Sequence, residues 1–473
     1  MKMLVGGEWT DTPERMEVTN PFDGSVVDSV PKARPADVER ALVGAVEGAR
    51  VMRNMPAYDR YRILNRASRL MFERQEDLGR TISIEEGKTL AEGRAEAGRA
   101  AETIELSAEE AKRIEGEVLP LDGASNGRGK FGFTLRVPCG VVVAITPFNF
   151  PLNLPCHKVG PALAAGNAVI LKPASDTPLS SLKLVEILVE AGLPPQAISC
   201  ITGSGSTVGD TLCTDSRVRK ISFTGSRDVG EHICKMAGLK RVTMELGSNS
   251  PLIVMDDADL QKAAEAIAVT GFANAGQVCI SAQRVIAVEK IYDDLLQVLR
   301  TRVAAIRHGN QLDSTTTMGP MIRQSDAARV NEWVQEAVRG GARLLHGGKC
   351  QGALHEPTLL ADVSPTMRIS CEELFGPAVA VTLAPDIDAA IALANDTRYG
   401  LSAAIFTESL DRALKFARQV DSGNIHINWG PLWRADLMPY GGLKQSGFGK
   451  EGPKYAIQEM TELKTVVIHG LSA

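Results

Sequence analysis

The sequence predicts an α/β fold, and two alternating patterns along the chain indicate it. From Val141 onward, apolar runs rich in β-branched residues ("VVVAITP", "NAVILKP", "AISCITG", "KISFTGS") alternate with helical segments such as "CHKVGPALAAG" and "LSSLKLVEILVEAG". Strands that are apolar throughout are typical of parallel sheets covered by helices on both faces. A second alternation begins at Ser250 with "SPLIVM" and the helical "DLQKAAEAIAVTGFANAG". We therefore expect a Rossmann-type domain followed by a second α/β domain.

The segment before the first alternation has a different character. Between Ala36 and Glu115, apolar residues recur at three- and four-residue spacing, which predicts a succession of helices. The next stretch, "GEVLPLDGASNGRGKFGFTLRVPCG", contains glycines, prolines and the alternating "KFGFTLRV", and it favours an extended hairpin. A chain of 473 residues exceeds what one hydrophobic core normally serves. Roughly two to four domains are expected for such a length.

Composition excludes several classes of partner. The formal net charge of −5 gives no electrostatic reason to expect nucleic acid or an anionic membrane. The N-terminal stretch lacks the apolar run of a secretory signal, and no stretch approaches the ~20 apolar residues of a membrane span. The eight cysteines show no CxxC pairing, so we expect neither a disulfide framework nor a metal site. A reducing, cytoplasmic location fits these features.

Polar residues stand at the ends of two predicted strands. Asn149 lies in "ITPFNFP" and Glu245 in "MELGSNSP", each directly after an apolar run. Because the carboxyl ends of parallel strands meet at one edge of the sheet, we expect Asn149 and Glu245 to share a cleft. Taken singly, Asn149 could cap a turn and Glu245 could form a surface ion pair. Likewise, Cys279 in "AGQVCIS" could simply pack as a small hydrophobe.

Ten short segments, in order, resemble the NAD(P)-dependent aldehyde dehydrogenase superfamily over essentially the whole chain. They are "TNPFDGSVV", "ITPFNFPLN", "LKPASDTP", "ISFTGS", "MELGSNSP", "GQVCIS", "CEELFGP", "YGLSAAIFT", "GNIHIN" and "PYGGLKQSGFGKEG". Within that superfamily, "GQVCISAQR" and "MPYGGLKQSGFGKEG" look most like the branch that includes lactaldehyde and non-phosphorylating glyceraldehyde-phosphate dehydrogenases.

The resemblance implies a chemical role for three residues. Cys279 would attack the aldehyde carbon, and the resulting thiohemiacetal would pass a hydride to the nicotinamide and leave a thioester for water to hydrolyse. Asn149 would form the oxyanion hole with the backbone N–H of Cys279, and Glu245 would be the general base. Covalent capture divides one difficult oxidation into two easier steps. A carboxylate needs some desolvation to act as a base near neutral pH.

The resemblance also implies a domain organisation. It assigns residues 1–116 and 140–247 to the cofactor-binding domain and residues 248–445 to the catalytic domain. It assigns residues 117–139 and 446–473 to a small β arm that joins subunits. Extended segments outside both domains would leave unpaired strand edges. We therefore expect a homodimer or homotetramer.

For the cofactor, the resemblance places Lys172 at the adenosine ribose, Ser226 at the pyrophosphate and Glu373 at the nicotinamide ribose. Many NAD-preferring members carry glutamate three residues after this lysine, but here the residue is Ser175. Losing that carboxylate removes repulsion of a 2′-phosphate, so we expect NADP to be tolerated or preferred beside NAD. The whole expected set is Ile145, Thr146, Lys172, Ser175, Gly209, Phe223, Gly225, Ser226, Leu246, Gly247, Glu373 and Phe375.

The substrate end departs from the common pattern of the family. Arg434 and His157 stand where other members carry aromatic residues, and Tyr440 is nearby in the sequence. Because a buried arginine requires an acidic partner or ligand, these three residues suggest a small polar or anionic aldehyde. The alternative is that Arg434 pairs with neighbouring Asp436 and never meets the substrate. Val278, next to the cysteine, is not the arginine that some anion-selective members have there.

Three other activities are compatible with parts of the pattern. A CoA-acylating aldehyde dehydrogenase would pass the acyl group to coenzyme A, although Glu245 as a water-activating base favours hydrolysis. A cysteine hydrolase or acyltransferase would use a thioester without redox chemistry, which the cofactor residues argue against. A catalytically silent protein on the same scaffold would have no need of Cys279, Glu245 and Asn149 together.

Overall fold

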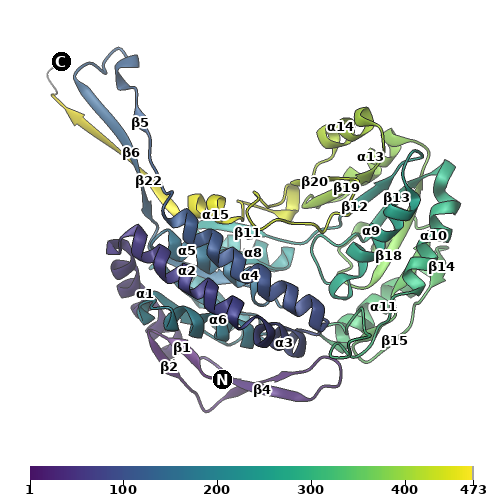
Figure 1. Cartoon of the computed structure of the whole chain (residues 1–473), viewed down its shortest axis with the longest axis horizontal. Helices are drawn as coiled ribbons and strands as arrows, with labels where there is room; N and C mark the ends of the chain where they lie inside the picture. The colour runs from purple at the N-terminus through teal and green to yellow at the C-terminus, as the bar shows by residue number, and fades with distance from the viewer. Residues whose placement is uncertain (471–473) are drawn as a thin grey trace.

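The chain forms two α/β bodies and a projecting arm (Figure 1), in a computed structural model that describes residues 1–470. The first body is built on an eight-stranded sheet whose five central strands are parallel. In spatial order its strands are β2 (Glu8–Thr10), β1 (Met3–Val5), β9 (Ile198–Cys200), β8 (Ala168–Lys172), β7 (Val141–Ile145), β10 (Val218–Thr224), β11 (Arg241–Glu245) and β21 (Gly447–Phe448). The first parallel strand, β7, is central, as in a Rossmann-type sheet.

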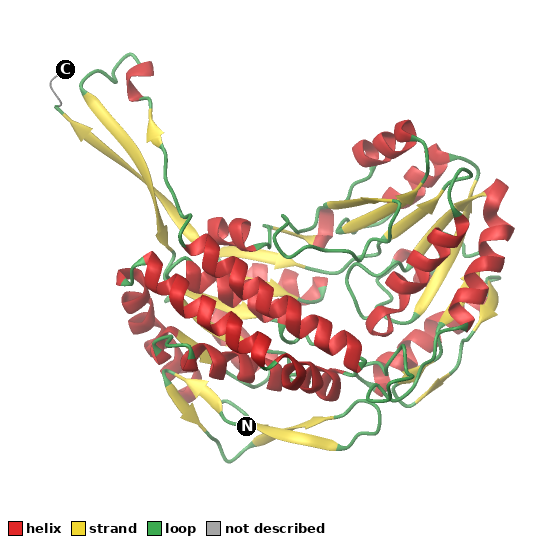
Figure 2. Ribbon diagram, viewed as in Figure 1, coloured by secondary structure: helices red, strands yellow, loops and turns green. Residues whose placement is uncertain are grey.

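Helices cover both bodies (Figure 2), and the predicted N-terminal helices belong to the first. Among them, α4 packs against α2, α3 and α5. The helices of this body are α1 (Pro35–Asn54), α2 (Ala57–Glu73), α3 (Gln75–Glu86), α4 (Leu90–Ala111), α5 (Asn153–Ala164), α6 (Leu179–Glu190), α7 (Asp210–Thr214), α8 (Arg227–Ala237) and α15 (Pro453–Glu459).

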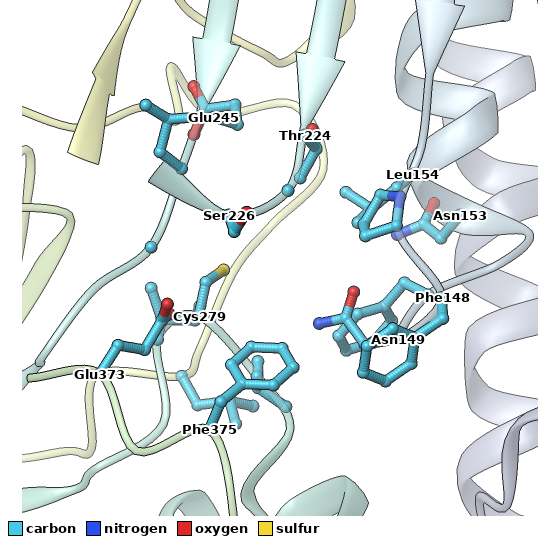
Figure 3. Close-up of a pocket in the computed structure, with 18 of the residues that line it drawn as sticks. Phe148, Asn149, Asn153, Leu154, Thr224, Ser226, Glu245, Cys279, Glu373 and Phe375 are labelled. Atoms are coloured by element: carbon cyan, nitrogen blue, oxygen red, sulfur yellow. The ribbon is translucent and has the colours of Figure 1, made fainter. Parts of the chain in front are cut away.

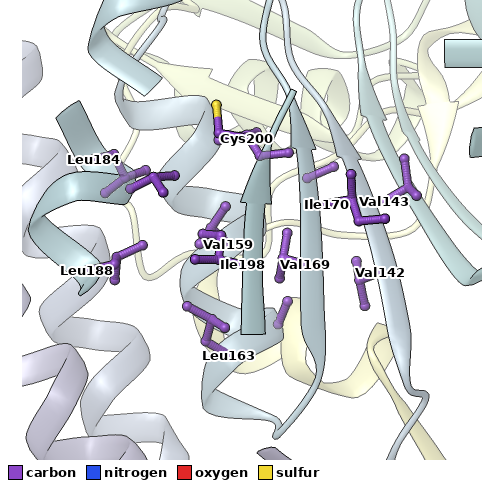
Figure 4. Close-up of a cluster of buried hydrophobic side chains, with 14 of the residues drawn as sticks. Val142, Val143, Val159, Leu163, Val169, Ile170, Leu184, Leu188, Ile198 and Cys200 are labelled. Carbon is purple, nitrogen blue, oxygen red and sulfur yellow. The ribbon is translucent and has the colours of Figure 1, made fainter. Parts of the chain in front are cut away.

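The core of the first body explains why its strands are apolar on both faces. Every residue of β7 is buried, and so is every residue of β8 and β9. Figure 4 shows Val143 and Ile170 from the sheet together with Val159 of α5 and Leu184 of α6. Helices on the two faces remove both sets of side chains from water, which is the pattern that the continuous apolar runs predict.

The second body contains a seven-stranded sheet and its own hydrophobic core. Its strands, in spatial order, are β14 (Arg343–His346), β17 (Thr358–Ala361), β18 (Ala378–Ala384), β13 (Arg284–Val288), β12 (Pro251–Val254), β19 (Ser402–Phe406) and β20 (Asn424–Ile427). All neighbours are parallel except β14 and β17. Its helices are α9 (Leu260–Phe272), α10 (Tyr292–Ala304), α11 (Gln324–Arg339), α12 (Arg368–Cys371), α13 (Ile387–Asn395) and α14 (Leu410–Gln419). The predicted two-body α/β fold is confirmed.

The arm is a three-stranded antiparallel sheet that projects away from both bodies (Figure 1). It consists of β5 (Val118–Leu119), β6 (Lys130–Pro138) and β22 (Thr461–His469). The predicted second segment of the arm, residues 446–473, is too long at its start. Residues 446–460 lie on the first body, because β21 pairs with β11 and α15 packs against α5. The last three residues of that predicted segment, 471–473, lie outside the described residues.

Two small hairpins complete the chain. They are β3 (Arg15–Thr19) with β4 (Val26–Pro31), and β15 (Cys350–Gln351) with β16 (Leu354–His355). Across residues 1–470, no helix combines the length and the apolar character that crossing a membrane requires.

Candidate active site

A cavity of about 560 Å³ is lined by residues from both bodies, and it gathers the chemically important side chains. Asn149 and Glu245 enter it from the first sheet, and Cys279 and Glu373 come from the second body. Figure 3 shows these four side chains around the same space. The expected cleft at the carboxyl ends of the strands is therefore present.

The loop that carries Cys279 has an unusual backbone. It follows a short helical turn, η4 (Ala273–Gly276), in which Asn274 and Ala275 have φ angles of 50° and 51°. Such left-handed conformations cost non-glycine residues on the order of 1–3 kcal/mol each, so neighbouring contacts must hold them. Gly276 has a φ of 70°, and a Cβ there would collide with the carbonyl oxygen of Gly376. The path of this loop therefore depends on left-handed backbone conformations and not on regular helix or strand hydrogen bonds.

Acidic side chains from the first body hold this loop. The side-chain amide of Asn274 donates to Oε1 of Glu86 at 2.8 Å, and its backbone N–H donates to Oε1 of Glu92 at 2.7 Å. Gln277 donates back to the carbonyl oxygen of Asn274 at 3.1 Å and accepts from the N–H of Ile322 at 3.0 Å. These hydrogen bonds offset the strain of the left-handed residues and fix the start of the loop that bears the cysteine.

Asn149 is held by the same corner of the first body. The ammonium of Lys88 donates to the carbonyl oxygen of Asn149 and to Oε2 of Glu96, the latter at 2.6 Å. Its ammonium also lies 3.6 Å from the centroid of the Phe150 ring. The amide nitrogen of Asn149 donates to the carbonyl oxygen of Gln277 at 2.8 Å. In Figure 3 this nitrogen is on the side of Asn149 that faces Cys279, where an oxyanion donor is needed.

Glu245 is a buried carboxyl group and not a surface ion pair. It ends β11, is 2% exposed, and neither carboxylate oxygen has a hydrogen-bond partner among residues 1–470. Burial raises the pKa of Glu245 well above its ordinary value, and the negative charge of Glu451 adds to the effect. Because burial disfavours the charged form, the Glu245 carboxylate is a stronger base than an exposed one.

Cys279 is a partly buried residue that lines the cavity. Burial raises the pKa of its thiol to about 12, while a hydrogen bond with Tyr440 acts in the opposite direction. The sulfur is 3.4 Å from the hydroxyl oxygen of Tyr440. Since the thiolate is the nucleophilic form, the groups around this sulfur decide how much of it is reactive.

A row of alternating charges forms the wall behind these residues. Glu451 accepts from Lys158 at 3.0 Å and from Nη1 of Arg434 at 3.1 Å. Burial opposes ionisation of Glu451, but Lys158 and Arg434 together hold its pKa at about 2. The partner of Arg434 is therefore Glu451, and the expected alternative of pairing with Asp436 is wrong. Arg434 still lines the cavity, with its guanidinium 4.0 Å above the Tyr440 ring.

His157 supports this wall and does not line the cavity. It is 1% exposed, and its ring lies between Nη2 of Arg434 at 3.2 Å and Oδ1 of Asp436 at 2.8 Å. Burial lowers the pKa of His157, and the neighbouring Arg434 lowers it further, so the ring is neutral. His157 is not among the residues that line the cavity, and its expected contact with substrate stays a prediction.

Arg99 is a cavity residue that the sequence did not indicate. It lies on α4, and its guanidinium donates twice to Asp436, at 2.7 and 3.0 Å. Its side chain remains 34% exposed and lines the cavity. In the sequence Arg99 is one of several arginines on an amphipathic helix, and no motif marks it. Only the packing of α4 beside the cavity reveals it.

The expected cofactor residues occupy two zones. Gly225, Ser226, Leu246, Gly247, Glu373 and Phe375 line the cavity itself. Five others lie at or just beyond the ends of strands of the first sheet: Ile145, Thr146, Lys172, Ser175 and Phe223. Gly209 ends the short helical turn η3 (Gly205–Gly209), and a Cβ there would lie 3.9 Å from the Lys172 side chain. Ser226 directly precedes α8, whose first-turn N–H groups suit a pyrophosphate. Glu373 accepts from the N–H of Ser248 at 2.9 Å, and burial raises its pKa to about 7.

Lys172 has the environment of a ligand-binding cation. It is 6% exposed, and within the described chain its ammonium forms a hydrogen bond only with the carbonyl oxygen of Pro173, at 3.1 Å. Burial lowers its pKa to about 8. Ser175 donates to the carbonyl oxygen of Gly203 at 3.2 Å and places no negative charge nearby. These residues fit an anionic cofactor group, and no cluster of metal-ligating side chains is found in residues 1–470.

Comparisons with known proteins show the family and the fold of this chain. A model of the aldehyde dehydrogenase family matches residues 9–466. The 3-sulfolactaldehyde dehydrogenase of Priestia aryabhattai is 46% identical over 467 residues, which cover 99% of this chain and 98% of that protein. The lactaldehyde dehydrogenase of Methanocaldococcus jannaschii is 38% identical, with 98% of this chain and 100% of that protein covered. The NADP-dependent glyceraldehyde-3-phosphate dehydrogenase of Bacillus halodurans, solved with NADP, superposes with a TM-score of 0.97 at 36% identity and covers 100% of this chain and 99% of its own.

The buried Lys88–Glu96 pair yields a stability prediction. Lys88→Met keeps the length of the side chain but leaves Glu96 buried without its cation. We expect the free energy of unfolding in urea to fall by about 3–5 kcal/mol. The matched control is Lys235→Met on α8, which removes one partner of an exposed pair with Glu231. Its effect should stay within about 0.5 kcal/mol. Equal losses in the two variants would contradict a special role for the buried pair.

Proposed function

Since this chain belongs to the aldehyde dehydrogenase family, we propose that it oxidises a small anionic aldehyde to its carboxylic acid through a covalent adduct on Cys279. The observation that carries the proposal is the meeting of Cys279, Asn149 and Glu245 in one cavity. NAD(P), when bound, supplies the hydride acceptor. The neighbouring Arg99 and Arg434 supply positive charge on the substrate side.

The side chains of this cavity divide the reaction between them. The Cys279 thiolate adds to the aldehyde carbon, and the N–H of the Asn149 side chain donates to the oxygen as it becomes negative. Losing one such donor costs about 3 kcal/mol in the barrier. After oxidation, water attacks the thioester on Cys279 while Glu245 takes up a proton from that water. The C–S bond then breaks and the thiolate is restored. A buried Glu245 beside the cavity favours this hydrolysis over transfer of the acyl group to coenzyme A.

An anionic substituent on the substrate is supported by the charges at the cavity wall. Arg434 is held by Glu451 and its side chain is only 7% exposed, whereas the side chain of Arg99, held by Asp436, remains 34% exposed. Arg99 is thus the better placed of the two arginines to pair with a sulfonate, phosphate or carboxylate. The relative from Priestia aryabhattai is named for 3-sulfolactaldehyde, a small aldehyde of this kind.

NADP is the cofactor that the adenosine end favours. A 2′-phosphate would find the buried ammonium of Lys172 and the uncharged Ser175 where NAD-preferring members place a carboxylate. The Bacillus halodurans relative was solved with NADP, which supports the same choice. We assign the cofactor to the first body and the nucleophile to the second. The eight free cysteines favour a reducing compartment, and we place the enzyme in the cytoplasm.

We also propose that the arm joins subunits into a homodimer or homotetramer. Its strands expose large apolar side chains that a monomer would leave in water, namely Phe131, Leu135, Leu463, Val467 and Ile468. Covering such residues provides a driving force for association.

A panel of aldehydes tests the substrate and the nucleophile. With NADP and NAD, the wild-type protein should prefer sulfonated, phosphorylated or carboxylated small aldehydes to uncharged ones of equal length. Arg99→Met should lower kcat/KM for the anionic aldehydes about 10- to 100-fold and change it little for uncharged ones, because a charge-assisted hydrogen bond is lost. Arg113→Met, just beyond the same helix, is the control and should behave as wild type.

Cys279→Ala tests the nucleophile. This variant should lose aldehyde oxidation and keep cofactor binding. Aldehyde oxidation by Cys279→Ala would contradict the proposed mechanism.

Ser175 variants test the cofactor preference. Ser175→Glu places a carboxylate beside the expected 2′-phosphate, so the ratio of kcat/KM for NADP to that for NAD should fall at least about tenfold. Ser175→Ala removes the hydroxyl without adding charge and should keep the ratio within about threefold. A wild-type preference for NAD of about a hundredfold, roughly 2.7 kcal/mol, would refute the proposal.

Sedimentation tests the arm. At micromolar concentration the wild-type protein should sediment as a dimer or tetramer. Leu463→Asp should shift it toward the monomer, because a charge would be buried in the subunit contact. Leu410→Asp, at an exposed position on α14, should leave the assembly unchanged. A wild-type monomer under these conditions would count against the arm as a subunit contact.

A further inference from the structure

Tyr440 directly contacts the proposed nucleophile. Its hydroxyl oxygen lies 3.4 Å from the sulfur of Cys279, within hydrogen-bonding range for sulfur. Among residues 1–470, no other side chain forms a hydrogen bond with that sulfur. Tyr440 is 4% exposed, so water does not compete strongly for its hydroxyl. The expected role of Tyr440 in substrate binding does not account for this contact.

The tyrosine ring is held in place from two sides. Its backbone pairs with that of Glu451, with N···O distances of 2.7 and 3.2 Å. The Arg434 guanidinium lies 4.0 Å above the ring and is itself fixed to Oε2 of Glu451 at 3.1 Å. A cation above the ring favours negative charge on the phenol oxygen, which makes the O–H a stronger hydrogen-bond donor. Glu451, Arg434 and Tyr440 therefore act as one rigid unit beside Cys279.

We propose that Tyr440 is a catalytic residue whose O–H donates a hydrogen bond to the Cys279 thiolate and increases the fraction of reactive thiolate at neutral pH. Tyr440 keeps its own proton throughout. The proton lost by the thiol goes to solvent or to a base, so Tyr440 stabilises the anion without being the base. This inference rests on the proposed function of Cys279 as the nucleophile.

The other charged groups near the sulfur show why this donor matters. Glu373 and Glu245 face Cys279 and disfavour its ionisation, whereas Arg434 favours it. Burial acts in the same direction as the two acids and raises the pKa of the thiol to about 12. Burial also raises the pKa of Tyr440 well above its ordinary value, so its hydroxyl stays protonated and able to donate. Tyr440 and Arg434 are thus the groups that counter burial and the acids.

Tyr440→Phe isolates this contribution because it removes the hydroxyl and keeps the ring beneath Arg434. The measurement is the rate of alkylation of Cys279 by iodoacetamide between pH 6 and 10, without aldehyde or NAD(P), with the modified cysteine identified by mass spectrometry. We expect the apparent pKa of the thiol to rise by about one unit. Tenfold less thiolate, offset by roughly threefold higher reactivity per thiolate, should slow alkylation about threefold at each pH below the midpoint.

Tyr292→Phe is the matched control. Tyr292 lies in the core of the second body and donates to Asp362 at 3.0 Å, away from Cys279. Its loss should lower the melting temperature without changing the alkylation rate. Equal or faster alkylation in Tyr440→Phe than in wild type, or equal slowing in both variants, would overturn the proposal. Because neither aldehyde nor cofactor is present, this result is independent of the substrate panel, and failure of the panel alone would refute only the proposed function.

Discussion

The buried ion pair between Lys88 and Glu96 is the contact on which the geometry of the site depends. Both side chains are almost completely removed from water, where an unpaired charge would be strongly unfavourable. Lys88 also holds the carbonyl oxygen of Asn149, and Glu96 accepts the N–H groups of Leu152 and Asn153 at 3.0 and 3.1 Å. The corner between α3 and α4 therefore fixes the chain on both sides of the proposed oxyanion donor.

The same segment of α3 and α4 also contacts the second body. Glu86 and Glu92 hold Asn274, which begins the left-handed turn before Cys279. The proposed nucleophile, Cys279, and the proposed oxyanion donor, Asn149, are thus held by one set of contacts, although they lie 130 residues apart in the chain. Strain in the turn and buried charge in the corner are both unfavourable alone. Both are tolerated because the surrounding hydrogen bonds stabilise the strained turn and the buried charges.

Two buried carboxyl groups in this site have opposite environments. Glu451 lies between Lys158 and Arg434, which hold its pKa at about 2 and keep it an anion. Within residues 1–470, Glu245 has no hydrogen-bond partner, and its pKa is raised well above the ordinary value by burial and then by Glu451. Because the pKa values of Glu451 and Glu245 are shifted in opposite directions, the two carboxyl groups can have distinct roles. The raised pKa makes Glu245 a stronger base than an exposed carboxylate, and Glu451 anchors Arg434 above the Tyr440 ring.

The sequence by itself determined the two-body α/β fold, because strands that are buried on both faces must be apolar throughout, as in "VVVAI" and "AVILK". Its resemblance to the aldehyde dehydrogenase family also marked Asn149, Glu245 and Cys279, since each stands in a short segment that resembles that family. Only the tertiary structure decided which charges meet. It paired Arg434 with Glu451 rather than Asp436, placed His157 behind the wall, and brought Arg99 to the cavity. It also moved residues 446–460 from the arm to the first body. Ion pairs between residues distant in the chain leave no periodicity or motif in the sequence, and their distances exist only once the helices and sheets have packed.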